Sequence, residues 1–348
     1  MSKLFFLISG EYESLSFGEL KAILEAERYA YNLTEKLDQT VRLTADVECV
    51  KQVQRRSAYT RVCALELFTT EANGEAIAQA AEATDFQAVL KEGETFAVRI
   101  RRIKEYSNKD ATMTIERKLG KHILQNTKDT SVNLKTPTKT FFGILTNHKI
   151  VFGLRLVEIQ PKPFVERRPR KKPFFHPSAM NAKLARCMVN LAHAHTGKTI
   201  LDPFCGTGTT MLEASLIGCN AIGTDVQKRM IKGTRRNLTH FGVTYEGLIM
   251  ADARKLPFAR IDCLVTDPPY GKSATTLKST TKKIVENVLA SAKPLLEKGQ
   301  RICIASPKTL QVAKLGSALG YMHVESHFAY VHRTLTREVA VFEKDDET

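Results

Sequence analysis

The chain has 348 residues, with 43% hydrophobic and 26% charged side chains, so it can bury apolar cores but is too long for a single one. We expect two or three domains. No apolar run approaches the roughly 20 residues that cross a membrane, and the apolar start predicts a strand rather than a signal peptide. Seven cysteines form no C-x-x-C pair, so neither zinc nor a disulfide framework is indicated, and we expect free thiols in a reducing cytoplasm. They are Cys49, Cys63, Cys187, Cys205, Cys219, Cys263 and Cys303.

The net charge of +15 is unevenly distributed along the chain. Residues 1–90 carry 9 basic and 14 acidic side chains, and residues 91–160 carry 14 and 7. Residues 161–174 then carry 6 basic side chains and 1 acidic one, and residues 175–348 carry 23 basic and 15 acidic ones. A polyanionic partner would explain a basic excess that begins midway. The alternative is a solvated linker, which is the usual reason for a charge run.

The first half alternates strand and helix patterns. Strands are predicted at 3–8, 41–45, 60–69, 96–103, 132–134, 141–146 and 149–156, and helices at 16–27, 47–57, 73–83 and 110–125. In the strand at 96–103, apolar residues alternate with basic ones, which predicts one buried and one basic face. Small α+β modules fit this order of elements.

Residues 161–173 are rich in proline, arginine and lysine, and their composition predicts a linker. Phe174-Phe-His-Pro-Ser178 follows, and then a helix predicted at 180–194. His176 could be taken for a general base, but we expect a packing or ligand contact there instead.

A glycine turn begins the ligand-binding part of the sequence. A short apolar strand ends in Asp202, and Phe-Cys-Gly206-Thr-Gly208 then precedes a helix predicted at 210–217. Such turns let a ligand approach the backbone closely. The dinucleotide fingerprint fails because its third glycine would fall at Met211. The next two strands end at Asp225 and Asp252, where carboxylates can bind nucleoside hydroxyls and amines.

The most informative motif is Asp267-Pro268-Pro269-Tyr270 at the end of a strand predicted at 261–266. The prolines stop the strand and leave carbonyls with no neighbouring amide to pair with. An acid, a bare carbonyl and an aromatic ring therefore meet where open α/β folds bind ligands. This group suits a planar amine whose protons are accepted while its ring stacks on the tyrosine. The alternative is a strand-ending turn with a buried tyrosine.

Strands at 301–305, 322–331 and 339–343 complete the predicted sheet. The last two would be joined by a basic loop, His332-Arg-Thr-Leu-Thr-Arg337, in which Arg333 and Arg337 are candidates for RNA contact. The alternative there is an ordinary surface turn. Residues 272–283, rich in Lys, Ser and Thr, are a candidate lid over the substrate.

This ordered set of motifs resembles the class I methyltransferases that use S-adenosylmethionine. The resemblance implies a Rossmann-like domain at 175–348, in which the glycine turn holds the methionine part, Asp225 the ribose and Asp252 the adenine amine. The implied amino-methylating residues are Asp267, Pro268 and Tyr270. The implied cofactor-binding residues are Asp202, Phe204, Gly206, Gly208, Thr209, Asp225, Asp252, Ala253, His176, Pro177 and Ser178.

The first half resembles a ferredoxin-like domain (1–55) followed by a THUMP RNA-binding domain (56–160), with a basic linker at 161–174. The resemblance rests on Glu94-Thr-Phe-Ala-Val-Arg-Ile-Arg-Arg102, on the helix at 110–124 and on Gly143-Ile-Leu-Thr-Asn-His148. It implies that this half binds the acceptor end of tRNA. The candidate contacts are Arg99, Arg101, Lys104, Lys118 and Lys121.

As a whole the chain resembles the archaeal tRNA guanine-10 N2-methyltransferases, since Asp267 stands where many adenine enzymes carry asparagine. The resemblance implies methyl transfer from S-adenosylmethionine to the exocyclic amine of a guanine in tRNA, by a cytoplasmic monomer with no metal. Whether one or two methyl groups are added, and whether a small activator protein is needed, stays open. The alternatives are a methyltransferase for another tRNA or rRNA nucleotide and a catalytically silent tRNA-binding subunit.

Overall fold

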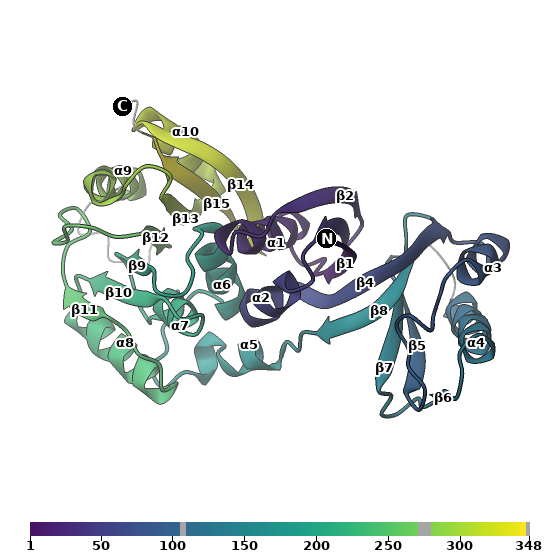
Figure 1. Ribbon diagram of the computed structural model, residues 1–348. Coiled ribbons are helices and arrows are strands. Elements are labelled where there is room, and N and C mark those ends of the chain that lie inside the picture. Colours follow the sequence, from purple (N-terminus) through teal and green to yellow (C-terminus); the bar gives the residue numbers. More distant parts are fainter. Residues whose placement is uncertain (105–108, 271–279, 346–348) are drawn as a thin grey trace. The chain divides into compact units, whose positions relative to one another are not determined.

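The computed structural model describes residues 1–104, 109–270 and 280–345 (Figure 1). The chain forms two compact units whose segments are interleaved along the sequence. The N-terminal unit comprises Met1–Glu13, Tyr29–Gln54 and Thr60–Gln160, and the C-terminal unit comprises Ser14–Arg28, Arg55–Tyr59 and Pro161–Thr348. No helix within the described ranges is both long and apolar enough to span a bilayer.

An eight-stranded sheet in the order β2-β3-β1-β4-β8-β7-β5-β6 runs through the N-terminal unit. Strand β4 pairs antiparallel with β1 on one side and β8 on the other, so the two predicted modules share one sheet. The strands are β1 (Ser2–Ile8), β2 (Tyr31–Leu37), β3 (Thr40–Ala45), β4 (Thr60–Glu71), β5 (Thr95–Arg102), β6 (Ser131–Val132), β7 (Lys139–Thr146) and β8 (Lys149–Glu158).

Alternating side chains of β7 supply the cores on the two faces of this sheet. Phe141 packs with Phe96 and Phe152 beneath α3 (Gly74–Glu82) and α4 (Lys109–Gln125). Phe142 points to the other face, where its ring lies 6.4 Å from that of Phe5 and stacks on it. The predicted alternation in β5 is confirmed, since Phe96, Val98 and Ile100 are buried.

The C-terminal unit contains a seven-stranded sheet in the order β11-β10-β9-β12-β13-β15-β14. The first five strands of this order are parallel, and β15 joins β13 antiparallel. This is the expected Rossmann-like order, which reverses between β9 and β12, where such folds bind ligands. The strands are β9 (Thr199–Asp202), β10 (Asn220–Asp225), β11 (Gly247–Met250), β12 (Cys263–Thr266), β13 (Arg301–Pro307), β14 (Tyr321–His332) and β15 (Leu335–Lys344).

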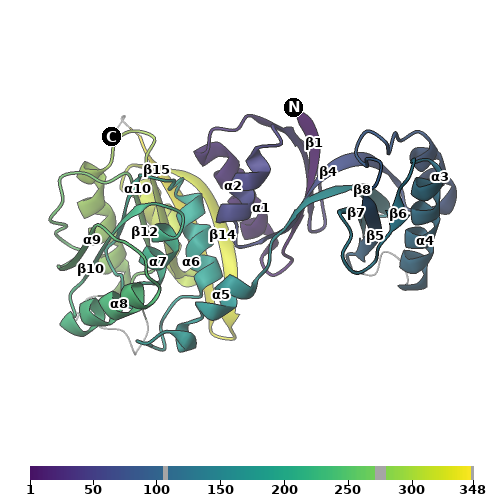
Figure 2. The same cartoon turned by 60° about the horizontal axis from the view of Figure 1, so that its bottom comes forward.

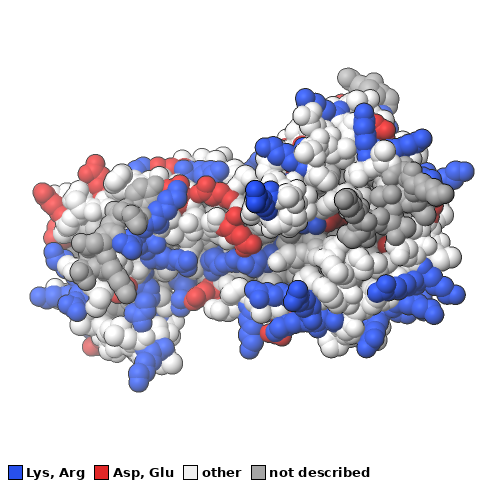
Figure 3. All heavy atoms as spheres, turned by 180° about the vertical axis from the view of Figure 1, so that it is seen from behind, with Lys and Arg blue, Asp and Glu red and all other residues white. Residues whose placement is uncertain are grey.

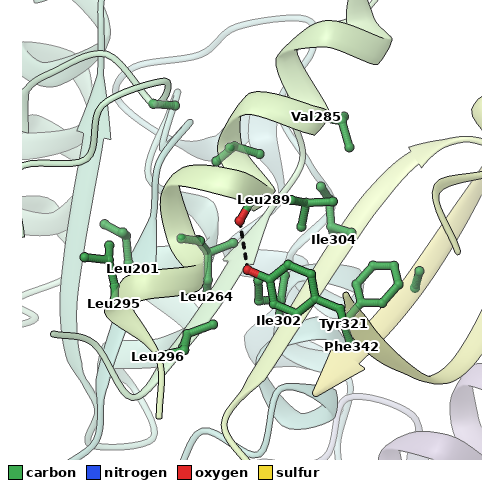
Figure 4. Close-up of a cluster of buried hydrophobic side chains, with 14 of the residues drawn as sticks. Leu201, Leu264, Val285, Leu289, Leu295, Leu296, Ile302, Ile304, Tyr321 and Phe342 are labelled. Carbon is green, nitrogen blue, oxygen red and sulfur yellow. Dashed lines mark hydrogen bonds between the residues drawn. The ribbon is translucent and has the colours of Figure 1, made fainter. Parts of the chain in front are cut away.

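Helices cover both faces of this sheet (Figure 2). They are α6 (Ala182–Leu191), α7 (Thr209–Ser215), α8 (Lys228–His240), α9 (Thr281–Ala292) and α10 (Val312–Ala318). Ile302 and Ile304 of β13 pack into the cluster that includes α9, shown in Figure 4. Tyr321 lies in the same cluster and donates its hydroxyl to the Leu289 carbonyl at 2.8 Å, so its one polar group is satisfied.

Helix α1 (Glu13–Ala26) and the end of α2 (Cys49–Arg56) contribute to the C-terminal unit. The fully buried carboxylate of Glu19 accepts hydrogen bonds from the amides of Ala58 and Tyr59 and from the side chain of Asn190 in α6. The guanidinium of Arg56, also fully buried, donates to Asn190 Oδ1 at 3.2 Å and to Glu27 at 2.6 Å. Burial raises the pKa of Glu19 and lowers that of Arg56, so both charges depend on these partners.

The structure departs from the predicted elements in several places, and α8, α9 and α10 are among the elements with no predicted counterpart. Residues 162–171, predicted as a linker, form α5 (Lys162–Glu166) and a 3-10 turn (Pro169–Lys171). The prediction of a solvated linker is wrong at two residues. Arg167 pairs with the fully buried Glu213 at 2.6 Å, and Lys172 is 5% exposed. Strand β2 had no counterpart among the predicted elements. All seven cysteines are buried and free.

Candidate active site

A cavity of about 840 Å³ lies at the carboxyl ends of β9, β10 and β12 in the C-terminal unit. Most of the candidate site residues line it, so segments far apart in sequence meet where the sequence predicts. The candidates on its wall are His176, Pro177, Ser178, Phe204, Gly206, Asp225, Asp252, Ala253, Asp267, Pro268, Tyr270 and Arg337. Asp202, Gly208 and Thr209 do not line the cavity.

The glycine turn needs the left-handed backbone that glycine adopts without strain. Gly206 and Gly208 have φ angles of +52° and +75°, and Gly208 caps α7. A Cβ atom on Gly208 would lie 2.6 Å from the Thr234 side chain. That threonine, on α8, donates its hydroxyl to the Gly206 carbonyl at 2.8 Å, so α8 helps to fix the turn.

The side chain of Asp225 is held at the cavity wall by backbone amides. It accepts hydrogen bonds from Gly206 N at 3.2 Å and Gln227 N at 2.9 Å. Burial raises the pKa of Asp225, and the two amides act against that rise. His176 lies close enough to lower the pKa slightly, and its own Nδ1 is 2.7 Å from the Ser178 hydroxyl. A fixed carboxylate beside a glycine turn can accept hydrogen bonds from two adjacent hydroxyls.

Asp202 and Thr209 lie beneath the turn. Asp202 is 4% exposed and accepts hydrogen bonds from Thr266 Oγ1 at 2.8 Å and Phe204 N at 3.2 Å, so it links β9 to β12. Burial raises its pKa to about 7. Thr209 accepts a hydrogen bond from Lys172 Nζ at 2.7 Å, and burial lowers the pKa of this lysine to about 8. These groups support the turn from below.

Asp252 is more open to solvent than the other acids. Its side chain is 36% exposed and makes a forked ion pair with Arg254, at 2.9 and 3.0 Å from Nε and 2.5 Å from Nη2. Hydrogen bonding by Arg254 lowers the pKa of Asp252, which keeps the carboxylate charged. Both residues line the cavity, so Arg254 adds a polar group that the sequence prediction missed.

Asp267 and Tyr270 are held together by Arg337. The arginine donates from Nη2 to Asp267 Oδ2 at 3.0 Å and from Nε to the Tyr270 hydroxyl at 2.5 Å, and its guanidinium lies 5.7 Å from the centre of the Tyr270 ring. The side chains of Arg337 and Asp267 are 12% and 14% exposed. Burial raises the pKa of Asp267, while the positive charge of Arg337 acts to lower it.

The two carboxylate oxygens of Asp267 have different surroundings. Oδ2 accepts the hydrogen bond from Arg337, whereas Oδ1 is buried and has no hydrogen-bond partner among the described residues. A buried acceptor without a partner is costly, unless a ligand supplies the donor. The free oxygen therefore points to a bound group that donates a hydrogen bond.

The prediction that Arg337 lies in a surface loop is wrong. Strand β15 begins at Leu335, so Arg337 is a strand residue that lines the cavity, and the β14–β15 turn is shorter than expected. Only Arg333 lies in an exposed turn. The lid predicted at 272–283 falls mainly on 271–279, outside the described residues, but Thr281 and Ile284 of α9 line the cavity.

The other candidate RNA contacts lie in the N-terminal unit. Arg101, Lys118 and Lys121 are exposed. Arg99 is half-buried and donates to the Leu134 carbonyl at 2.6 Å, and Lys104 pairs with Asp38 at 2.7 Å. Both are thus engaged within the unit.

Two family models match the chain. A UPF0020 model, described as an RMKL-like methyltransferase domain, matches residues 169–337. A DNA methylase model matches residues 69–236, which include the glycine turn but end before Asp267.

Solved structures with a similar fold cover nearly the whole chain. TrmN from Thermus thermophilus aligns with a TM-score of 0.55 and 22% identity, over 99% of this chain and 100% of that one. SMU.472, solved in complex with SAH, aligns with a TM-score of 0.54 and 16% identity, over 100% and 99%. At these identities the likeness shows the fold, that of class I methyltransferases.

Curated relatives match over the same span. A tRNA (guanine(10)-N2)-dimethyltransferase of Methanothermobacter thermautotrophicus is 35% identical over 339 residues, which cover 97% of this chain and 98% of the relative. Another from Methanocaldococcus jannaschii is 28% identical over 97% and 99%. With its Rossmann-like sheet, glycine turn and Asp267-Pro-Pro-Tyr270 site, the chain belongs to the tRNA (guanine(10)-N2)-dimethyltransferase family.

Proposed function

We propose that this chain transfers methyl groups from S-adenosylmethionine to the exocyclic 2-amino group of a guanine in tRNA, at position ten. The observation that supports the proposal most is the buried Oδ1 of Asp267, which has no hydrogen-bond partner among the described residues, in the cavity that also includes Asp225 and Gly206. Membership of the family supports the choice of substrate.

The cavity residues fit S-adenosylmethionine better than a dinucleotide. Asp225 is placed for the ribose hydroxyls, the Gly206 turn for close approach of the methionine part, and Asp252 for the adenine amine. The dinucleotide fingerprint lacks its third glycine, because Met211 stands there, whereas the carboxylate of Asp225 suits the ribose of a nucleoside. When bound, the cofactor supplies an electrophilic methyl group.

Guanine presents two adjacent donors, the ring N1–H and the 2-amino group. Asp267 Oδ1, which has no partner among the described residues, and the carbonyl of Pro268 are acceptors for these protons. Tyr270 supplies the ring on which the base stacks. These contacts hold the nitrogen of the base in place with its lone pair toward the methyl group. A base inside a duplex must first be turned out of the stack to reach them.

Arg337 prepares Asp267 for this role. By occupying Oδ2 and placing a positive charge 3.0 Å away, it favours the carboxylate form and leaves Oδ1 for the substrate. The amine nitrogen then attacks the methyl carbon, and the N–C bond forms as the S–C bond breaks. The proton leaves the nitrogen late, to Asp267 or to water, so no covalent enzyme intermediate is needed.

The same geometry accommodates a second methyl transfer. After the first, one N–H remains on the nitrogen, and the single free oxygen of Asp267 can still accept it. The product is therefore N2,N2-dimethylguanosine, as the names of the archaeal relatives also suggest.

Digestion and mass spectrometry of tRNA treated with the purified protein and cofactor test both the nucleotide and the number of methyl groups. A methyl group on another base or at another position would contradict the proposed specificity. A product that stops at N2-methylguanosine would contradict the second transfer. Absence of any product with a small activator protein added as well would contradict the activity.

We further propose that residues 1–160 supply most of the tRNA affinity and that the enzyme acts as a monomer in the cytoplasm. The exposed Arg101, Lys118 and Lys121 support the first point, and the free, buried thiols are typical of a reducing compartment. Light scattering of the free protein tests the monomer, and activity with and without an added small activator tests whether one is required.

A further inference from the structure

Helix α8 carries a row of basic side chains on its exposed side. We call Lys228, Arg229, Lys232, Arg235 and Arg236 the basic face of α8; all five are exposed, and 228–240 contain no acidic residue. The spacing of these residues, at three to four positions over two turns, places them along one side of the helix. Met230, Ile231, Thr234, Asn237 and Leu238 form the buried side.

Among the residues that the structure describes, no carboxylate forms an ion pair with the basic face. Elsewhere in the C-terminal unit several arginines pair with acids: Arg167 and Arg186 with Glu213, Arg254 with Asp252, and Arg301 with Glu343. None of the ion pairs found within the described ranges includes a residue of α8. In Figure 3 blue side chains project along the lower right, where α8 lies.

The first turn of α8 is part of the candidate active site. Arg229 and Met230 line the cavity, and the Arg229 guanidinium lies 5.7 Å from the ring of Phe174. From Lys228 to Arg236 the helix rises about 12 Å at 1.5 Å per residue, so the basic face extends over roughly that distance from the first turn, which lines the cavity.

The helix is also fixed to the cofactor turn. Asn237 donates from Nδ2 to the carbonyls of Thr207 and Phe174, both at 2.9 Å, and accepts from Phe174 N at 2.8 Å. With the bond from Thr234 to Gly206, these contacts connect α8 to two adjacent residues of the turn and to Phe174. A ligand held on the basic face is therefore placed firmly relative to the cavity.

We propose that the basic face of α8 binds the phosphate backbone of the RNA beside the target guanine. The inference rests on the proposed function, since Arg229 and Met230 of α8 line the cavity that the target base would enter. A polyanion suits five unpaired cations, and phosphate contacts fix register without reading sequence. Because the basic face begins at the cavity, we favour the substrate RNA as its ligand. An acidic protein would not be expected to bind beside the active site.

The test compares two double variants of the full-length protein with equal loss of charge. Arg235→Gln/Arg236→Gln removes two members of the basic face that are distant from the cavity. Lys298→Gln/Lys314→Gln is the control, because these lysines lie in the loop before β13 and in α10. Methylation kinetics on tRNA are measured at several salt concentrations, together with cofactor binding by calorimetry.

For the α8 variant we expect KM for tRNA to rise on the order of tenfold, with kcat and cofactor affinity unchanged. The slope of log affinity against log salt should shrink by about 0.7–0.9 for each lost contact. The control pair should leave both quantities near wild type. Equal behaviour of the two variants, with normal methylation, would overturn the inference while leaving the proposed function intact.

Failure of the wild-type protein to methylate any tRNA would instead remove the proposed function. If an acidic protein binds the basic face instead, the α8 variant should show normal tRNA kinetics but lose a partner that the wild-type protein binds. That result would also overturn the proposal that the face binds RNA.

Discussion

Replacing Arg337 with glutamine should shift the pH dependence of methyl transfer. The Nη2–Oδ2 pair is 3.0 Å long between two side chains that are 12% and 14% exposed, so solvent screens it weakly. A hydrogen bond to a charged group contributes about 1.5–3 kcal/mol. Losing it raises the pKa of Asp267, because the charged carboxylate is then destabilised by about that amount.

The direction of this pH shift follows because the charged carboxylate of Asp267 is the active form. Burial already raises the pKa of Asp267, and Arg337 opposes that effect. In Arg337→Gln the carboxyl therefore stays protonated to higher pH, and the acid limb of the kcat profile should move to higher pH. Activity that is lost at the acid end of the profile should partly return at its alkaline end.

Single-turnover methylation of tRNA across pH 5.5 to 9.5, at saturating cofactor, measures this shift. Arg337→Lys keeps a positive charge but not the forked donor, so it should lie between wild type and Arg337→Gln. Calorimetry should show unchanged cofactor affinity in both variants. A rate reduced equally at every pH would refute this role and indicate that Arg337 only shapes the cavity.

Four further predictions follow from residues already described. Asp267→Ala should abolish methyl transfer, with a barrier higher by on the order of 2–4 kcal/mol, while calorimetry finds cofactor binding nearly normal; substantial turnover would exclude the assigned site. Asp225→Ala should weaken cofactor binding and leave tRNA affinity unchanged, as measured by titration of each ligand. Arg101→Ala should lower the salt slope of tRNA binding by about one, and an unchanged slope would place the contact elsewhere. Arg56→Met should destabilise the protein by about 3–5 kcal/mol in a thermal melt, since it leaves buried partners unpaired, whereas the exposed Arg55→Met should cost far less.

The sequence predicts the architecture best where apolar periodicity is strong. Strands β9, β10 and β12 and their terminal acids lie at the predicted positions because parallel buried strands are continuous apolar runs. Strand β2 was not predicted because it is an edge strand with four of seven residues exposed. Its sequence therefore shows no clear alternation of buried and exposed residues.

The sequence did not allow us to predict which side chains pair with one another. The link from Arg337 to Asp267 joins residues 70 positions apart, and only the antiparallel pairing of β13 with β15 brings them together. The pairing of Asp252 with Arg254 is local, and an arginine two positions after a strand-ending acid was a signal that could have been read. The charge totals of long regions did not reveal the basic face of α8, because its five basic residues lie in a long segment that carries both basic and acidic side chains.

The interleaving of the two units has a consequence for the order in which the protein folds. Helix α1 leaves the ribosome early, yet its buried Glu19 is completed by Asn190, 171 positions later, and the Leu15 carbonyl meets Cys187 after 172. Closing loops of this length costs entropy before any contact is gained, which slows folding. Until α6 is synthesised, Glu19 and the Leu15 carbonyl lack these partners. A nascent chain stopped before α6 is therefore expected to be the species most dependent on chaperones.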